Sequence, residues 1–234
     1  MRTYLAATLR VDLFIELQLL LLTFSIGVQD AIAFPDFKCF ASNQTGNTVV
    51  LAVGAAGLGG DQFSLPNIGI SLATFVAGAT ITGQIANVIG PSRRDWLLAT
   101  HLAQTLMVFG AAAVQGVSGG QGTGPFAMGS IALLAFSSGA QVASMRPMRI
   151  QEITTAMATA AWVDFVIDPM LLSSNNRPRN RRALFLTTLI GGSFAGAFMY
   201  KTVGSANTLI LSAAVKLLVT FTLLFNKQQS RQDA

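Results

Sequence analysis

The sequence is poor in charge, in cysteine and in histidine. Only 11% of its 234 residues are charged, whereas a soluble domain carries about 25%, so too little charge is present to cover a water-facing surface. Cys39 is the only cysteine and His101 the only histidine. These absences exclude a disulfide framework, a redox pair of cysteines and a zinc site built from several such ligands. We expect no metal site and no cofactor.

Apolar residues are abundant instead. They make up 52% of the chain, and the mean hydropathy is +0.56. Eight apolar segments follow one another at residues 12–34, 37–58, 66–90, 95–117, 124–145, 150–172, 182–203 and 206–226. Most approach the roughly 20 residues with which a helix crosses a bilayer, and backbone in hydrocarbon must satisfy its hydrogen bonds internally. The sequence therefore predicts an all-α polytopic transmembrane helical bundle in a lipid bilayer, one membrane domain over residues 1–234.

Short polar termini flank this domain at residues 1–11 and 227–234. The net charge of +5 does not indicate nucleic acid as a partner, because the basic residues sit in short clusters between apolar segments with no aromatic or glycine framework around them.

The second half of the chain resembles the first. A separation of 114 residues relates three pairs: Gly78 and Gly192, Gly90 and Gly204, and Thr45 and Thr159. The sequence SIGVQDA at residues 25–31 also resembles SSGAQVA at residues 137–143, with a separation of 112. We therefore expect two internal repeats, residues 12–117 and 124–226, as in many transporter folds.

The basic residues favour one topology. Eight full crossings would leave eight of them on one side of the membrane and six on the other. If segments 37–58 and 150–172 are instead broken or re-entrant, the count is twelve against two, which agrees better with the positive-inside rule. We expect six full crossings plus two broken segments, inverted halves and cytoplasmic N- and C-termini, with eight crossings as the alternative.

The two broken segments carry the polar residues from which we expect a substrate site. An unbroken polar block in the first needs shelter at membrane depth, and a half-helix starting there would turn unpaired amides inward, toward an anionic or dipolar ligand. The second has threonines at the corresponding start. The predicted substrate-binding residues are Gln29, Asp30, Asn43, Gln44, Thr45, Gly46, Asn47, Thr48, Gln141, Thr154, Thr155, Thr159 and Asp164.

Ionisable residues also occur inside the apolar segments, where contact with lipid would be costly. Lys216 lies near the centre of the last segment. We expect it to form a buried ion pair with Asp30, Asp164 or Glu16, although such a pair could also serve packing alone.

Two motifs carry a resemblance to a known family. GVQDAIAF at residues 27–34 and FASNQTGNTVVL at residues 40–51 resemble the signature of the YoaK-like multi-pass membrane proteins, the group of domain of unknown function 1275. QEITTAMATAAWVDFVIDPMLL at residues 151–172 resembles the fungal branch of that group. The resemblance implies the membrane architecture and no established activity. Ala160 stands where the first copy has Gly46, so the second motif departs from the first.

Two function classes follow. Inverted halves, paired broken segments and buried ionisable residues favour a transporter or channel for an unknown small solute. The alternative is a non-transporting membrane scaffold or a membrane-embedded enzyme. We do not expect an enzyme, because no nucleophile and base stand at motif spacing and no catalytic residue can be named. Homo-oligomers are compatible with either class.

Overall fold

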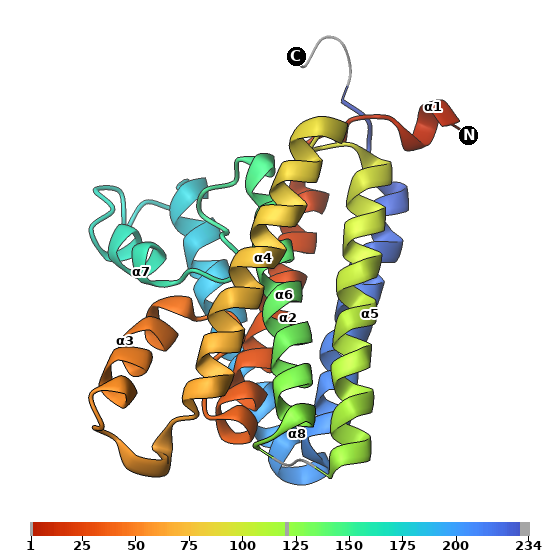
Figure 1. The fold of residues 1–234 in the computed structure, drawn as a ribbon. Coiled ribbons are helices and arrows are strands. Elements are labelled where there is room, and N and C mark those ends of the chain that lie inside the picture. Colours follow the sequence, from red (N-terminus) through yellow and green to blue (C-terminus); the bar gives the residue numbers. More distant parts are fainter. Residues whose placement is uncertain (1, 120–121, 230–234) are drawn as a thin grey trace.

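The computed structural model describes residues 2–119 and 122–229, so residues 230–234 of the expected polar C-terminus lie outside the described ranges. Within them the chain forms a helical bundle (Figure 1), in which five helices are long and apolar enough to cross a membrane. These are α2 (Leu13–Phe37), α4 (Leu65–Ile89), α5 (Arg94–Ser118), α6 (Pro125–Met145) and α8 (Arg177–Thr222). The expectation of an all-α, multi-pass integral membrane protein is confirmed.

Large apolar side chains cover much of the outer surface of the bundle. Val88 on α4 is 87% exposed and Phe198 on α8 is 66% exposed. Contiguous apolar surface of this kind is rare on soluble monomers, and it is the surface that lipid tails cover.

Local sequence sets the helix ends. The Asp12 carboxylate accepts hydrogen bonds from the amides of Phe14 (3.0 Å) and Ile15 (3.3 Å) at the start of α2, and thus satisfies two of the amides that a helix start leaves without partners. At the other end, Lys38 takes a left-handed conformation with φ of 56°, which stops the helix and turns the chain back.

Helix α8 consists of two arms that meet at Gly204. Gly204 has φ of 81° and ψ of 174°, a conformation that only glycine adopts readily. The first arm starts beside the start of α2, where Arg181 binds Glu16. Just after Gly204, Ser205 donates a hydrogen bond to Asp36 at the end of α2. The second arm then runs back, so that Thr222 lies beside Gln18. Segments 182–203 and 206–226 are therefore antiparallel arms of one interrupted helix.

Two of the eight apolar segments contain only short helices. Helix α3 (Gln44–Ala55) has 12 residues and α7 (Thr159–Val166) has 8. At 1.5 Å per residue they measure about 18 Å and 12 Å, well short of the roughly 30 Å hydrocarbon core. Figure 1 shows them on the same side of the bundle, where α3 packs against α4 and α7 against α8. The remaining helical pieces are α1 (Arg2–Leu5) and the 3₁₀ turns η1 (Gly60–Gln62), η2 (Arg146–Met148) and η3 (Leu223–Phe225).

Glycines let the long helices approach closely in two places. A Cβ added to Gly78 on α4 would lie 2.3 Å from the carbonyl oxygen of Phe136 on α6. A Cβ added to Gly192 on α8 would lie 2.3 Å from the carbonyl oxygen of Phe24 on α2. The facing helices carry matching glycines. A Cβ added to Gly139 on α6 would lie 2.1 Å from the carbonyl oxygen of Phe75 on α4, and one added to Gly27 on α2 would lie 2.6 Å from that of Leu189 on α8. Helices α2 and α8, and α4 and α6, therefore pack backbone to backbone.

Both terminal segments meet at one end of the bundle. The amide of Leu9 donates to the Ser92 carbonyl (2.9 Å), and the amide of Arg10 donates to the Lys227 carbonyl (2.9 Å). The guanidinium of Arg94 is fully buried, donates to the Tyr4 carbonyl (2.7 Å) and to the Asn226 carbonyl, and lies 3.8 Å from the Tyr4 ring centroid. We call this end the arginine end. The basic residues that it carries are Arg10, Arg93, Arg94, Arg146, Arg149, Arg177, Arg179, Arg181, Arg182 and Lys227.

Candidate functional site

The polar block at residues 43–48 builds the start of α3. The side chain of Asn43 accepts a hydrogen bond from the Gly46 amide at 3.1 Å and caps the helix. Asn47 is buried, and its side chain forms two hydrogen bonds with the backbone of Phe40. It accepts from the Phe40 amide (2.9 Å) and donates to the Phe40 carbonyl (2.8 Å). The side-chain amide of Gln44 donates to the Ala41 carbonyl (3.0 Å). These side chains hold a tight loop ahead of the half-helix.

Asp30 ties this loop to α2. Its carboxylate accepts hydrogen bonds from the amides of Ala41 (3.0 Å) and Ser42 (2.9 Å) and from the Ser42 hydroxyl. Asp30 lies seven residues before the end of α2 at Phe37, about 10 Å along the helix. The chain therefore turns back along α2, and α3 begins beside α2 rather than beyond its end.

The remaining residues of the block face other neighbours. Gln44 and Asn47 both donate to the hydroxyl of Ser71 on α4, each at 3.2 Å. Thr48 is exposed and donates to the Gln44 carbonyl (2.8 Å), and Thr45 is also exposed. Most hydrogen bonds of the block thus hold the loop and the start of α3, and the two to Ser71 fix α3 against α4.

The second segment is organised differently. The hydroxyl of Thr154 donates to the Met157 carbonyl (2.7 Å) and accepts from the Met157 amide (3.1 Å). Thr155 is buried with φ of 64°, and its hydroxyl has no partner among the described residues. Thr159 begins α7 without a side-chain cap at the preceding residue. Asp164 is 53% exposed and lies 3.9 Å from Arg182. Within the described ranges, no hydrogen bond joins this segment to residues 43–48.

Lys216 is buried at the centre of the bundle, at 1% exposure. Its amine donates to Oε1 of Gln141 (2.5 Å) and to Oε1 of Gln104 (3.3 Å). None of the ion pairs among the described residues includes it. The structure thus gives Lys216 amide partners instead of Asp30, Asp164 or Glu16. Asp30 binds the loop ahead of α3, Asp164 lies at the surface of α7, and Glu16 binds Arg177 and Arg181.

Polar side chains continue from Lys216 toward the far end of the bundle. One turn earlier on α8, the Ser212 hydroxyl lies 2.7 Å from that of Ser25 on α2. The side-chain amide of Gln29 donates to Ser25 (3.1 Å) and to Ser212 (2.9 Å), and its Oε1 is buried with no partner among the described residues. We call the six residues Ser25, Gln29, Gln104, Gln141, Ser212 and Lys216 the central polar cluster.

Sequence reasoning identified part of this cluster. Gln29, Gln141 and Lys216 stood out as polar residues in apolar segments, whereas Ser25 and Ser212 did not, because a serine in a membrane helix can bond to its own backbone. Their alignment on facing helices is visible only in the fold.

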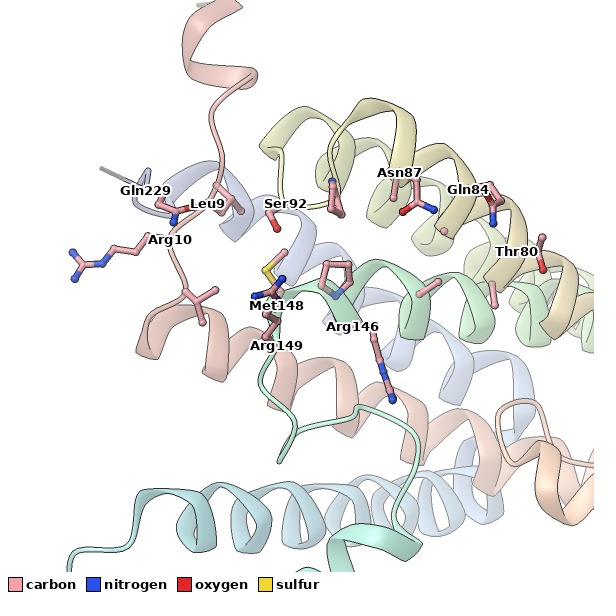
Figure 2. A pocket seen from close by; sticks show the side chains of 17 residues that line it. Leu9, Arg10, Thr80, Gln84, Asn87, Ser92, Arg146, Met148, Arg149 and Gln229 are labelled. Carbon is pink, nitrogen blue, oxygen red and sulfur yellow. The ribbon is translucent and has the colours of Figure 1, made fainter. Parts of the chain in front are cut away.

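Cavities open at the arginine end. One measures about 1170 Å³ and lies between the last turns of α4, the end of α6 with η2, and both terminal segments (Figure 2). A second cavity of about 550 Å³ adjoins it, shares Arg146 and Arg149, and reaches Thr154 and Asp164. Sequence reasoning assigned Arg146 and Arg149 to topology alone and did not place them in a site.

Ion pairs close the arginine end around the start of α8. Glu16 binds Arg177 (2.5 Å) and Arg181 (2.6 Å). The Asp168 carboxylate accepts from the Met170 amide (2.8 Å) and binds Arg182 (3.2 Å). The bond from the Met170 amide, with further help from Asn176 and the arginines, holds the pKa of Asp168 below its usual value. These contacts fix the chain between α7 and α8.

The comparison with protein families identifies the chain. The model described as "Protein of unknown function (DUF1275)" matches residues 18–222, which is most of the sequence, and the chain belongs to this family. The expected family resemblance is confirmed at this level. Comparisons with curated proteins and with solved structures find no match.

Proposed function

We propose that the protein is a transporter or channel for a small solute, and that the solute or its coupling proton passes the central polar cluster. The observation that carries this proposal is the amine of Lys216, which is buried with only amide oxygens as partners. It lies 12 residues, about 18 Å, beyond Gly204, near the middle of the roughly 30 Å hydrocarbon core. An ammonium without a counter-ion at this depth costs several kcal/mol, which packing alone does not require.

Orphaned polar atoms support the same proposal. Oε1 of Gln29 and Nε2 of His101 are buried without a hydrogen-bond partner among the described residues. Each such atom costs about 1–3 kcal/mol, and a solute or proton passing the cluster would use them.

An internal duplication with inverted halves accounts for the arrangement. The packing contacts repeat along the sequence, since Gly78 packs on Phe136 and Gly192 packs on Phe24. The two glycines are 114 residues apart and the two phenylalanines are 112 residues apart. Within the cluster, Gln29 and Gln141 are 112 residues apart, as are Gln104 and Lys216. Glycine packing and cluster residues thus follow the offsets that the sequence predicts.

The directions of the helices support the inversion. Helix α2 starts at the arginine end and α6 finishes there, so corresponding first helices run oppositely. Counting both arms of α8, six helical stretches cross and α3 and α7 re-enter. In this proposal the cluster lies between two inverted halves, as in alternating-access transporters.

The arginine end faces the cytoplasm in this proposal. The basic residues outside the cluster collect there, while Lys38 and Lys201 lie at the other end, beside the last turn of α2 and the turn at Gly204, and positive charge is enriched on cytoplasmic loops. Cysteine accessibility tests this, because the native Cys39 is buried. Cysteines placed at Arg93 and at Lys227 should react only from the cytoplasmic side. Reaction of both from outside would overturn the proposed orientation, and reaction of only one from outside would overturn the inverted topology.

Other features stay predictions. The role of residues 43–48 and 154–159 in binding the solute, the fungal branch of the family and a homo-oligomeric state rest on the sequence alone. A scaffold without transport is the second candidate. It predicts that Asp30→Asn and Asn47→Ala preserve the cellular phenotype while the protein stays abundant.

Reconstitution tests the transport proposal. Purified protein in liposomes is compared with empty liposomes for flux of protons, inorganic ions, carboxylates, amino acids and sugars. The proposal expects protein-dependent flux of at least one of them. Unchanged permeability over the whole panel, with the protein shown to be folded and inserted, would contradict it.

A further inference from the structure

The large cavity at the arginine end has one charge sign. Its volume of about 1170 Å³ is somewhat above the roughly 300–1,000 Å³ typical of small-molecule sites. Three arginines line it, Arg10, Arg146 and Arg149, and none of the lining residues is acidic. Figure 2 shows Arg10 on the N-terminal segment beside Gln229, Arg149 and Arg146 below it at the end of α6, and Asn87, Gln84 and Thr80 along α4.

Two of these arginines have no structural task. The side chains of Arg146 and Arg149 are exposed and form no hydrogen bond or ion pair within residues 2–119 and 122–229. Other arginines at the same end are engaged: Arg94 binds two backbone carbonyls, and Arg181 binds Glu16 and Glu152. Arginine forks bind the planar oxygen pairs of phosphate and carboxylate groups, so unengaged forks beside a cavity suit an anion.

The opposite wall supplies neutral donors. Thr80, Gln84 and Asn87 stand one turn apart on one face of α4 and line the cavity. Their side chains are exposed and form no hydrogen bond among the described residues. Within an apolar helix that crosses the membrane, such a stripe is costly toward lipid. This cost is avoided if the stripe faces a polar occupant of the cavity.

We propose that this cavity is a binding site for a phosphate-type anion, held by the guanidinium groups of Arg146 and Arg149 and by the polar stripe of α4. The occupant is either a free anion or the headgroup of an anionic lipid, since both present the same oxygens. The site does not depend on the transport proposal, because binding requires no passage through the central polar cluster.

The backbone offers a selective variant. Arg149 has φ of 55°, and its amide donates to the Arg146 carbonyl (3.2 Å). Glycine takes this left-handed conformation more easily than arginine does. Arg149→Gly therefore removes a guanidinium while it favours the local fold.

The test is a titration of purified full-length protein with inorganic phosphate in a neutral maltoside detergent at low ionic strength. We compare wild type, Arg149→Gly and the double variant Arg146→Gln with Arg149→Gln. The matched control, Lys201→Gln with Lys227→Gln, removes the same charge outside the cavity. Because charge-assisted hydrogen bonds are strong, we expect phosphate affinity to fall roughly 10-fold or more in Arg149→Gly, further in the double variant, and little in the control.

A second arm distinguishes the source of the anion. Lipids retained by each variant after purification are measured by native mass spectrometry, with phosphatidylglycerol compared against phosphatidylcholine. If phosphate does not bind, yet wild type and control retain phosphatidylglycerol that the double variant loses, the occupant is a headgroup. If neither ligand depends on the two arginines, or if the control loses as much as the double variant, the proposal is overturned. Should the double variant fail to fold, Gln84→Leu with Asn87→Leu takes its place, and unchanged binding there counts against the site.

Discussion

The close packing of α8 on α2 makes a quantitative prediction for Gly192→Ala. The new methyl group would lie 2.3 Å from the Phe24 carbonyl oxygen, where ordinary contact begins at 3.4 Å, so the helices must separate by roughly 1 Å. Overpacking of this kind costs about 1–3 kcal/mol. The better helix propensity of alanine returns up to about 1 kcal/mol. We expect a net loss of about 1–2 kcal/mol in the free energy of unfolding.

Gly191→Ala is the matched control, because a Cβ there has nothing within 4 Å. Unfolding is followed by size-exclusion chromatography after heating in detergent. For a chain of this size 1 kcal/mol corresponds to about 2–4 °C, so the apparent Tm of Gly192→Ala should fall by roughly 2–8 °C while that of Gly191→Ala stays equal or rises. Gly78→Ala should behave like Gly192→Ala. Equal stability of Gly191→Ala and Gly192→Ala would refute the close contact.

Three further variants test the ends of the bundle and the loop ahead of α3. Asp30→Ala removes the acceptor of the Ser42 amide, so hydrogen exchange at that amide should accelerate at least tenfold; unchanged exchange would show that the carboxylate does not hold the loop. Arg94→Lys loses the fork that joins the Tyr4 and Asn226 carbonyls, and limited proteolysis should cut the N-terminal segment sooner than in wild type. The folded pKa of Asp168 lies below its usual value of 3.8, so its contribution to stability is complete above that pH and is lost as pH falls through the folded pKa. Asp168→Asn should thus lower the apparent Tm at pH 6 and have less effect at pH 3, and an effect that grows on acidification would contradict this sign.

The sequence predicts well those features that depend on one segment of the chain alone, such as where a helix begins and ends. Hydropathy placed the long helices within a few residues of their bounds, and the break between residues 203 and 206 coincides with Gly204. The shortness of α3 and α7 was anticipated from loop arginines, whose distribution reflects topology. The helix cap was predicted wrongly: the sequence favours Thr45 or Asn47 as the cap of this half-helix, whereas Asn43 caps α3 in the structure.

The partners of buried charged residues could not be predicted from the sequence. Lys216 binds two glutamines because α5, α6 and α8 meet at one point, and no periodicity within a helix encodes that meeting. The cavity around Arg146 likewise forms from terminal segments far apart in sequence. Tertiary packing decides such contacts, and the sequence could name only the residues that needed partners.

Flux through reconstituted protein, compared between wild type and Lys216→Met, tests the central claim most directly. Lys201→Met, at an exposed lysine beyond the bundle core, controls for the lost charge. The account predicts that the solute moved by wild type is moved equally by Lys201→Met and at background rate by Lys216→Met, at equal amounts of folded protein. Full flux in Lys216→Met would contradict a path through the central polar cluster.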